Sequence, residues 1–192
     1  MQVSKFKNLP KIELHLHLDC SLSYDVVKKI DPKIDLNHYK SSFQAGESCS
    51  SLNDYLKCAD NAIHLMQTKE NLEFIVEDLF KQLHDDNVIY VEIRFAPLLH
   101  CDGDLNAKKV VDIICKSASI QSKKYNIDYG LILCTLRHYS KEQSMETIKL
   151  VKEFSSMGVV GFDIAADEAG YPIDNHIKAF TYAKNNNLNI TA

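Results

Sequence analysis

The sequence has 192 residues, of which 45% are hydrophobic and 25% are charged, a composition typical of a soluble globular protein. The formal net charge of −4 argues against binding to a nucleic-acid polymer, because such binding requires lysine and arginine clustered on one face. No stretch reaches the roughly 18 apolar residues of a membrane span, residues 1–10 contain no secretory leader, and the six cysteines form no CxxC pair, so we expect a reduced, cytoplasmic protein without membrane contact.

Apolar runs of strand length alternate with longer segments of helical periodicity along the chain. The predicted strands are Ile12–Leu18, Val88–Phe95, Tyr129–Leu136, Val159–Ile164 and Leu188–Ala192. The predicted helices are Ser23–Ile30, Ser51–Met66, Lys69–Asp85, Ala107–Lys124, Lys141–Ser156 and Asp174–Asn186, and Ser140 is expected to cap the helix that follows it. This alternation indicates βα units around a parallel sheet. The segment between the first two strands is too long for a simple crossover and predicts an inserted helical lid.

Polar side chains gather on one face of several of these strands. In the first strand, a period of two places four polar residues on one face: Glu13, His15, His17 and Asp19. Glu92 and Arg94 share a face of the second strand, where we expect them to form a structural ion pair. Asp163 lies between two apolar residues in the fourth strand. The pattern indicates a barrel packed on helices, with a site at its carboxyl-terminal mouth. An open doubly wound sheet is disfavoured, because the sequence contains no GxGxxG turn.

The histidines of the first strand are candidate metal ligands. His15 and His17 are separated by one residue, so their side chains project from the same face about 6.5 Å apart along the strand. That arrangement suits two ligands on one zinc ion. Two hydrogen-bonded histidines lining a barrel would give the same short pattern, although the flanking Glu13 and Asp19 favour a site.

Four ordered blocks of sequence resemble the adenosine deaminase family of metal-dependent amidohydrolases. They are LPKIELHLHLDCSL at Leu9–Leu22, YVEIRFAPLLH at Tyr90–His100, LILCTLRH at Leu131–His138 and VVGFDIAADE at Val159–Glu168. The helical segment Ser51–Thr68 resembles the lid of that family. The resemblance implies a (β/α)8 barrel of the TIM type, here incomplete, with about five of the eight βα units. Residues 1–192 are therefore expected to be the N-terminal part of a single hydrolase barrel domain, ending before the C-terminal strands.

The resemblance also assigns roles to residues of this chain. It implies that His15 and His17 bind zinc and that Asp19 contacts a ribose 5′-hydroxyl. Ala166 and Cys20 stand where the family usually has glycines. The backbone N–H at the position of Ala166 meets a purine ring nitrogen, and an added Cβ would narrow the pocket. The candidate apolar walls for the base, each of them equally suited to core packing, are Leu52, Tyr55, Leu56 and Leu136.

The implied activity is zinc-dependent hydrolytic deamination of adenosine to inosine and ammonia. In the family, the third histidine ligand and the glutamate that acts as general acid follow a later strand, so we expect no general acid in residues 1–192 and no activity from this chain alone. The alternative substrates are adenine and N6-modified adenine nucleotides, although Asp19 favours a purine nucleoside with a free 5′-hydroxyl over a phosphate. The alternative to an enzyme is a non-catalytic half-barrel that binds only metal or a partner, with self-association through its open sheet edge.

Overall fold

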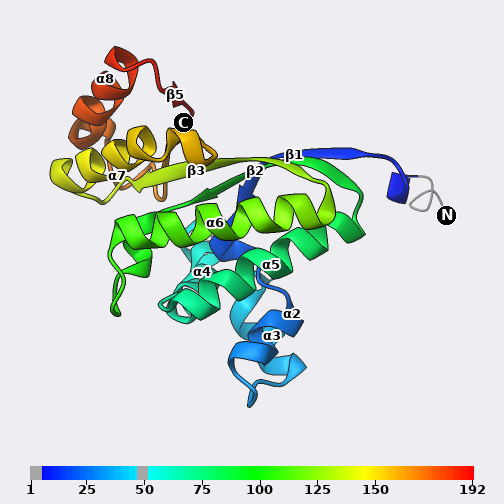
Figure 1. The fold of residues 1–192 in the computed structure, drawn as a ribbon. Helices are drawn as coiled ribbons and strands as arrows, with labels where there is room; N and C mark the ends of the chain where they lie inside the picture. The colour runs from blue at the N-terminus through cyan, green and yellow to red at the C-terminus, as the bar shows by residue number, and fades with distance from the viewer. Residues whose placement is uncertain (1–5, 47–51) are drawn as a thin grey trace.

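The structure, a computed structural model, describes residues 6–46 and 52–192, and only the backbone of 52–57. It contains a five-stranded parallel sheet whose strands follow sequence order: β1 (Lys11–His17), β2 (Val88–Phe95), β3 (Asp128–Leu136), β4 (Val159–Ala165) and β5 (Asn189–Ile190). Strand order without a reversal is the topology of a βα barrel, whereas a doubly wound sheet reverses its order at a switch point. The predicted incomplete barrel is therefore confirmed (Figure 1).

Helices connect the strands. They are α2 (Tyr24–Ile30), α3 (Leu36–Phe43), α4 (Leu52–Leu65), α5 (Lys69–Asp85), α6 (Ala107–Tyr125), α7 (Lys141–Glu153) and α8 (Ile177–Asn185). Short 3₁₀ turns follow several elements: η1 (Leu18–Cys20), η2 (Pro97–His100), η3 (Ser155–Met157) and η4 (Ile173–His176). Each predicted helix is present, and α3 is a helix that the sequence periodicity did not predict. None of the described helices has both the length and the apolar character needed to cross a membrane.

Local side-chain interactions explain where several helices begin. The first turns of α2, α5, α6 and α7 are capped by the side chains of Ser23, Thr68, Asn106 and Ser140, each of which accepts a backbone N–H bond. The predicted cap at Ser140 is confirmed. Gln143 completes a capping box there, because its Oε1 accepts the N–H of Ser140 at 2.9 Å.

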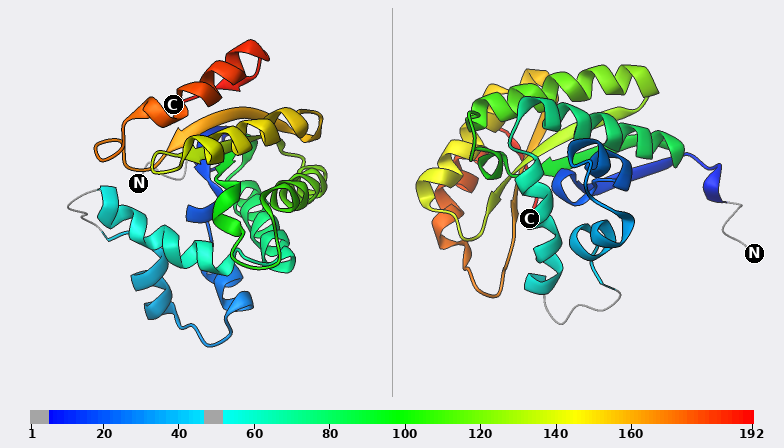
Figure 2. Two further views of the ribbon diagram at one scale, coloured as in Figure 1. Left: turned by 90° about the vertical axis from the view of Figure 1, so that its left-hand side faces the viewer. Right: turned by 90° about the horizontal axis from the view of Figure 1, so that it is seen from below.

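The main hydrophobic core lies between one face of the sheet and the helices that cover it. Fully buried residues of strands and helices meet there, among them Phe80, Ile114, Leu131, Leu133, Ile148 and Phe162. Burial of each large apolar side chain contributes about 1.5–3 kcal/mol. In Figure 2, α5 and α6 lie side by side over this face. The core on the helix side leaves the opposite face of the sheet available for polar residues.

The predicted helical lid after the first strand is present. Helix α4 packs against η1 and η2, the turns that follow β1 and β2, so it lies over the carboxyl ends of these two strands. Side-chain bonds fix the preceding helices, since the Tyr39 hydroxyl donates to the carbonyl of Leu22 at 2.7 Å and Ser23 Oγ donates to Asp78 at 2.7 Å. These bonds attach α3 to the segment that follows η1 and attach the start of α2 to α5.

The edge strand β1 is more exposed than its apolar alternation predicts. Ile12 is 63% exposed and Leu14 is 55% exposed, whereas Leu16 is half-buried and Leu18 is fully buried. The reason is that β1 pairs only with β2, and none of the described helices covers the outer face of its first half. An uncovered edge strand of this kind is open to further pairing.

Candidate functional site

His15 and His17 lie together at the carboxyl end of β1. Their ring centroids are 5.3 Å apart, and the ring planes are inclined at 42°. One extra residue of β1 is inserted between Glu13 and Leu16 relative to β2, so the alternation assumed from the sequence is interrupted at a bulge. The two imidazoles are neighbours despite this interruption.

Burial favours the neutral form of His17. The side chain is half-buried, and burial lowers its pKa from the usual value; His15 and Arg94 lower the pKa further, while Asp163 opposes them. A neutral imidazole is the form that binds metal ions. Nδ1 of His17 lies 3.9 Å from Oδ1 of Asp19, and a neutral ring makes no ion pair at that distance.

The spacing of the two rings fits a shared metal ion. Zinc binds imidazole nitrogens at about 2.0–2.1 Å with tetrahedral angles, which places the centroids of two rings roughly 5 Å apart. The measured 5.3 Å agrees with this spacing. Within the described residues, His, Cys, Asp and Glu side chains form no group of three or more that could hold a metal ion. Two imidazoles are fewer than the three protein ligands that a catalytic zinc ion typically has.

Asp19 lies in the turn η1 and not in the strand where the sequence placed it. Its side chain is almost fully buried, and Oδ1 has no hydrogen-bond partner. Burial raises the pKa of this carboxyl to about 6, although the thiol of Cys20 lowers it. At neutral pH the group is therefore mainly ionised and presents a buried acceptor without a donor. A buried acceptor in this state is suited to a hydroxyl group of a ligand.

Leu136 and Ala166 meet at the carboxyl ends of β3 and β4. They belong to a small apolar cluster that also contains Cys134 and Tyr139 and is separate from the main core. Ala166 has a φ of 80°, in the left-handed region that L-residues other than asparagine rarely adopt. Tyr139 is a residue that the sequence did not single out, although an aromatic side chain directly after the third block was a usable signal.

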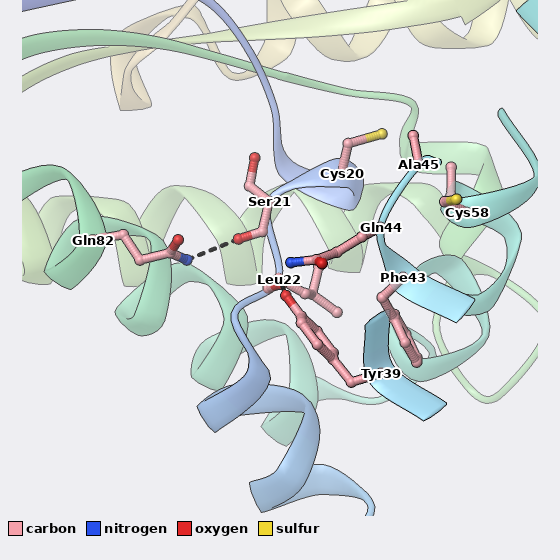
Figure 3. A pocket seen from close by; sticks show the side chains of 10 residues that line it. Cys20, Ser21, Leu22, Tyr39, Phe43, Gln44, Ala45, Cys58 and Gln82 are labelled. Carbon is pink, nitrogen blue, oxygen red and sulfur yellow. Dashed lines mark hydrogen bonds between the residues drawn. The ribbon is translucent and has the colours of Figure 1, made fainter. Parts of the chain in front are cut away.

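The lid borders a pocket of about 310 Å³ beside η1. The predicted base-contacting residues Leu52, Tyr55 and Leu56 are on α4, but their side chains lie outside the described part of the structure. Figure 3 shows the pocket lining, which includes Cys20 from η1 and Cys58 from α4, and the bond from Gln82 to the carbonyl of Ser21 at 2.8 Å. The pocket thus lies between η1 and the lid, and His15 and His17 are not among its lining residues.

Arg94 forms the central ion pair of the inner face. Nη1 of Arg94 donates to Oδ2 of Asp163 at 2.5 Å, and each side chain is only 5% exposed. The thiol of Cys134 also donates to this carboxylate at 3.7 Å. The sequence suggested Glu92 as the partner of Arg94, and this was wrong, because Glu92 instead accepts the hydroxyl of Tyr90 at 3.1 Å. The partner of Arg94 lies 69 positions away in sequence, on a strand that flanks β3 from the other side.

Sequence comparisons relate the chain to known deaminases. Residues 10–192 match the family described as adenosine deaminase. A curated adenosine deaminase from Clostridium acetobutylicum is 37% identical over 191 residues, which cover 96% of this chain and 57% of that protein. One from Clostridium perfringens is 38% identical over 180 residues, which cover 90% of this chain and 53% of that protein. The chain therefore spans little more than half the length of these relatives.

Solved structures share the fold. The crystal structure of Arabidopsis ADAL complexed with IMP matches with a TM-score of 0.83 and 24% identity, over 98% of this chain and 58% of the other. An amidohydrolase from Burkholderia ambifaria with bound Zn matches with a TM-score of 0.84 and 19% identity, over 98% of this chain and 53% of the other. At these identities the likeness concerns the fold.

Proposed function

Because the chain belongs to the adenosine deaminase family, we propose that the intact protein hydrolyses adenosine to inosine and ammonia with one bound zinc ion. The observation that carries the proposal is the pair of imidazoles of His15 and His17, whose centroids lie 5.3 Å apart at the carboxyl end of β1. Active sites of βα barrels lie at this end of the strands. We place the reaction in cytoplasmic purine nucleoside metabolism.

The residues of this chain would bind and orient the nucleoside. When bound by His15 and His17, zinc would supply a water nucleophile that is active near neutral pH. Asp19 would accept the 5′-hydroxyl through its unpartnered Oδ1. The backbone N–H of Ala166 would donate to a ring nitrogen of the purine. Leu136 would contact the base and exclude water from it. The resemblance gives Leu56 the same role, and its side chain lies outside the described part of the structure.

The reaction also requires a third protein ligand and an acid that protonates the ring. The described residues contain no group of three His, Cys, Asp or Glu side chains that could hold a metal ion, and the resemblance places the acid after a later strand. We therefore propose that residues 1–192 are the N-terminal part of one barrel domain and that the remaining part supplies both groups. The support is that the chain covers only 57% of the length of its Clostridium acetobutylicum relative.

The test is the change in ultraviolet absorbance as adenosine becomes inosine, measured on the intact protein with and without a chelator. We expect the chelator and His17→Ala each to abolish turnover. His84→Ala is the matched control and should keep turnover, because His84 lies at the last turn of α5 beside Tyr125. Full activity of His17→Ala would refute the metal assignment. Turnover by residues 1–192 alone would show that the acid is not missing from this chain.

A substrate comparison tests the role of Asp19. A carboxylate at this position repels a 5′-phosphate, so adenosine should be a better substrate than its 5′-monophosphate or free adenine. Asp19→Asn is expected to weaken adenosine binding and to narrow the difference between adenosine and the monophosphate. A wild-type preference for the monophosphate, or for an N6-modified nucleotide, would overturn the assignment of adenosine as substrate.

The uncovered edge of β1 favours association with another polypeptide when the chain is isolated. Ile12 and Leu14 are exposed there, and among the described strands β1 has no neighbour on its other side. We propose that the isolated chain self-associates through this edge. Light scattering should then show a mass that rises with concentration, and Leu14→Lys should reduce it. A strictly monomeric wild-type chain at all concentrations would refute this association.

A further inference from the structure

The peptide bond between Leu14 and His15 is held by charged side chains. β1 pairs with β2 up to Glu13 and again from Leu16, so Leu14 and His15 lie at the bulge, outside the paired positions. The N–H of His15 donates to Oε1 of Glu13 at 2.9 Å. The carbonyl of Leu14 accepts Nη2 of Arg94 at 3.1 Å. Both polar groups of this one peptide bond therefore have side-chain partners.

The guanidinium that binds Leu14 is itself fixed from a distant strand. Its other terminal nitrogen donates to Asp163 of β4 at 2.5 Å, and the two side chains are equally buried. The planar fork of arginine can make both bonds only in a narrow range of orientations. Arg94 therefore connects the side chain of Asp163 in β4 to the backbone of β1 immediately before His15.

The orientation of this peptide bond restricts where the side chain of His15 can point. A bulge redirects the side chain of the inserted residue, and the bulged residue is not fixed by ladder bonds. His15 is exposed, so packing does not hold its ring in one direction. The plane of the Leu14–His15 peptide fixes the position of the His15 Cα atom and restricts the directions that its Cα–Cβ bond can take. Bonds that hold this plane therefore narrow the range of directions open to the imidazole.

We propose that Glu13 and Arg94 are positioning residues that aim the His15 imidazole toward the ion shared with His17, by holding both polar groups of the Leu14–His15 peptide bond. This inference rests on the proposed function, because the aim of the ring matters only for a ligand. Groups that orient metal ligands typically change metal affinity about 10–100-fold when they are removed.

The experiment uses residues 1–192 with Co²⁺ as the metal probe, and it has two readouts. The first is the hydrogen-exchange rate of the His15 amide, measured by nuclear magnetic resonance without metal. The second is Co²⁺ affinity, measured from its visible absorption. Glu13→Ala is expected to speed exchange at His15 and to weaken Co²⁺ binding about 10–100-fold. Glu13→Gln should restore both values, because its Oε1 still accepts the N–H.

Glu92→Ala is the matched control. It removes the same charge from the neighbouring strand, but its carboxylate binds the hydroxyl of Tyr90 and not the bulge. It should leave both readouts at the wild-type value. Arg94→Lys should weaken Co²⁺ binding, because one ammonium group cannot make both bonds of the guanidinium. If Arg94→Lys fails to fold, Glu13→Ala still tests the proposal.

The outcomes separate this inference from the function on which it rests. If the wild-type chain binds Co²⁺ and Glu13→Ala binds it equally well with unchanged exchange at His15, the positioning role is overturned and the metal pair stands. If the wild-type chain binds no Co²⁺, the metal pair fails, and the positioning role fails with it. Loss of affinity in Glu13→Ala with rescue by Glu13→Gln supports both.

Discussion

Replacement of Ala166 by glycine is expected to stabilise the protein. Ala166 directly follows β4 and has a φ of 80°. Among the described residues other than glycine, the further positive φ values belong to asparagines, at Asn87, Asn126 and Asn187. Asparagine tolerates the left-handed region because its short polar side chain bonds locally, and alanine has no such group. The structure therefore holds Ala166 in a strained conformation that glycine would relieve.

The magnitude follows from two opposing effects. The left-handed conformation costs an L-residue roughly 1–2 kcal/mol relative to its preferred region. Glycine gives the unfolded chain more conformational freedom, which offsets roughly 0.5–1 kcal/mol of that gain. We expect a net increase of about 0.5–1 kcal/mol in the free energy of unfolding of Ala166→Gly, or roughly 1–4 °C in Tm for a chain of this size.

Urea unfolding followed by circular dichroism measures this change without metal or substrate. Ala165→Gly is the matched control, because Ala165 is the adjacent residue at the end of β4, is also half-buried and has no positive φ. It should lose about 0.5–1 kcal/mol, as glycine in a strand does. If Ala166→Gly is destabilised as much as Ala165→Gly, the argument from backbone strain is wrong.

Other predictions concern a turn, the inner ion pair and a buried histidine. Gly158→Ala should lower the free energy of unfolding by at least about 1 kcal/mol in thermal unfolding, because φ is 94° and an added Cβ would lie 2.9 Å from the Tyr129 hydroxyl oxygen. Arg94→Met should cost about 3–5 kcal/mol in urea unfolding, because Asp163 stays buried without its partner; a loss below about 1 kcal/mol would contradict this. Burial lowers the pKa of His100 from 6.5 to about 4, so the unfolded state binds the proton first and stability falls as pH drops through that range. The loss in the free energy of unfolding reaches about 3 kcal/mol. Urea titrations of His100→Leu across this pH range should show a free energy of unfolding that depends less on pH than that of the wild-type protein.

Features set by local sequence were predictable. The bounds of Val88–Phe95 match β2, and Ser140 caps α7 as predicted, with Gln143 completing a capping box that was not predicted. Both depend on residues close in the chain, namely a run of alternating side chains and a serine followed by glutamine at the third helical position. The separation of His15 from His17 by one residue was enough to bring the rings together.

Features set by partners distant in sequence were not predictable. The bulge in β1 exists only relative to β2, so a period of two assigned Glu13 and His15 to a regular strand. The partner of Arg94 is Asp163, 69 positions away, whereas spacing suggested Glu92. The positive φ of Ala166 had one signal, the glycine that the family usually has at this position, because alanine itself gives no sign of such a conformation.

Polar contacts on the inner face of the sheet make the orientation of His15 depend on three strands. Arg94 of β2 binds both Asp163 of β4 and the Leu14 carbonyl of β1, while the apolar core lies on the other face of the sheet. Packing in the core determines which strands are neighbours, but it does not constrain the backbone conformation of the bulge at the exposed edge. The polar contacts therefore decide how the bulge is oriented. For that reason a substitution at Asp163 should change the orientation of His15, because it releases Arg94 from one of its two contacts. Asp163 itself need not bind the ion.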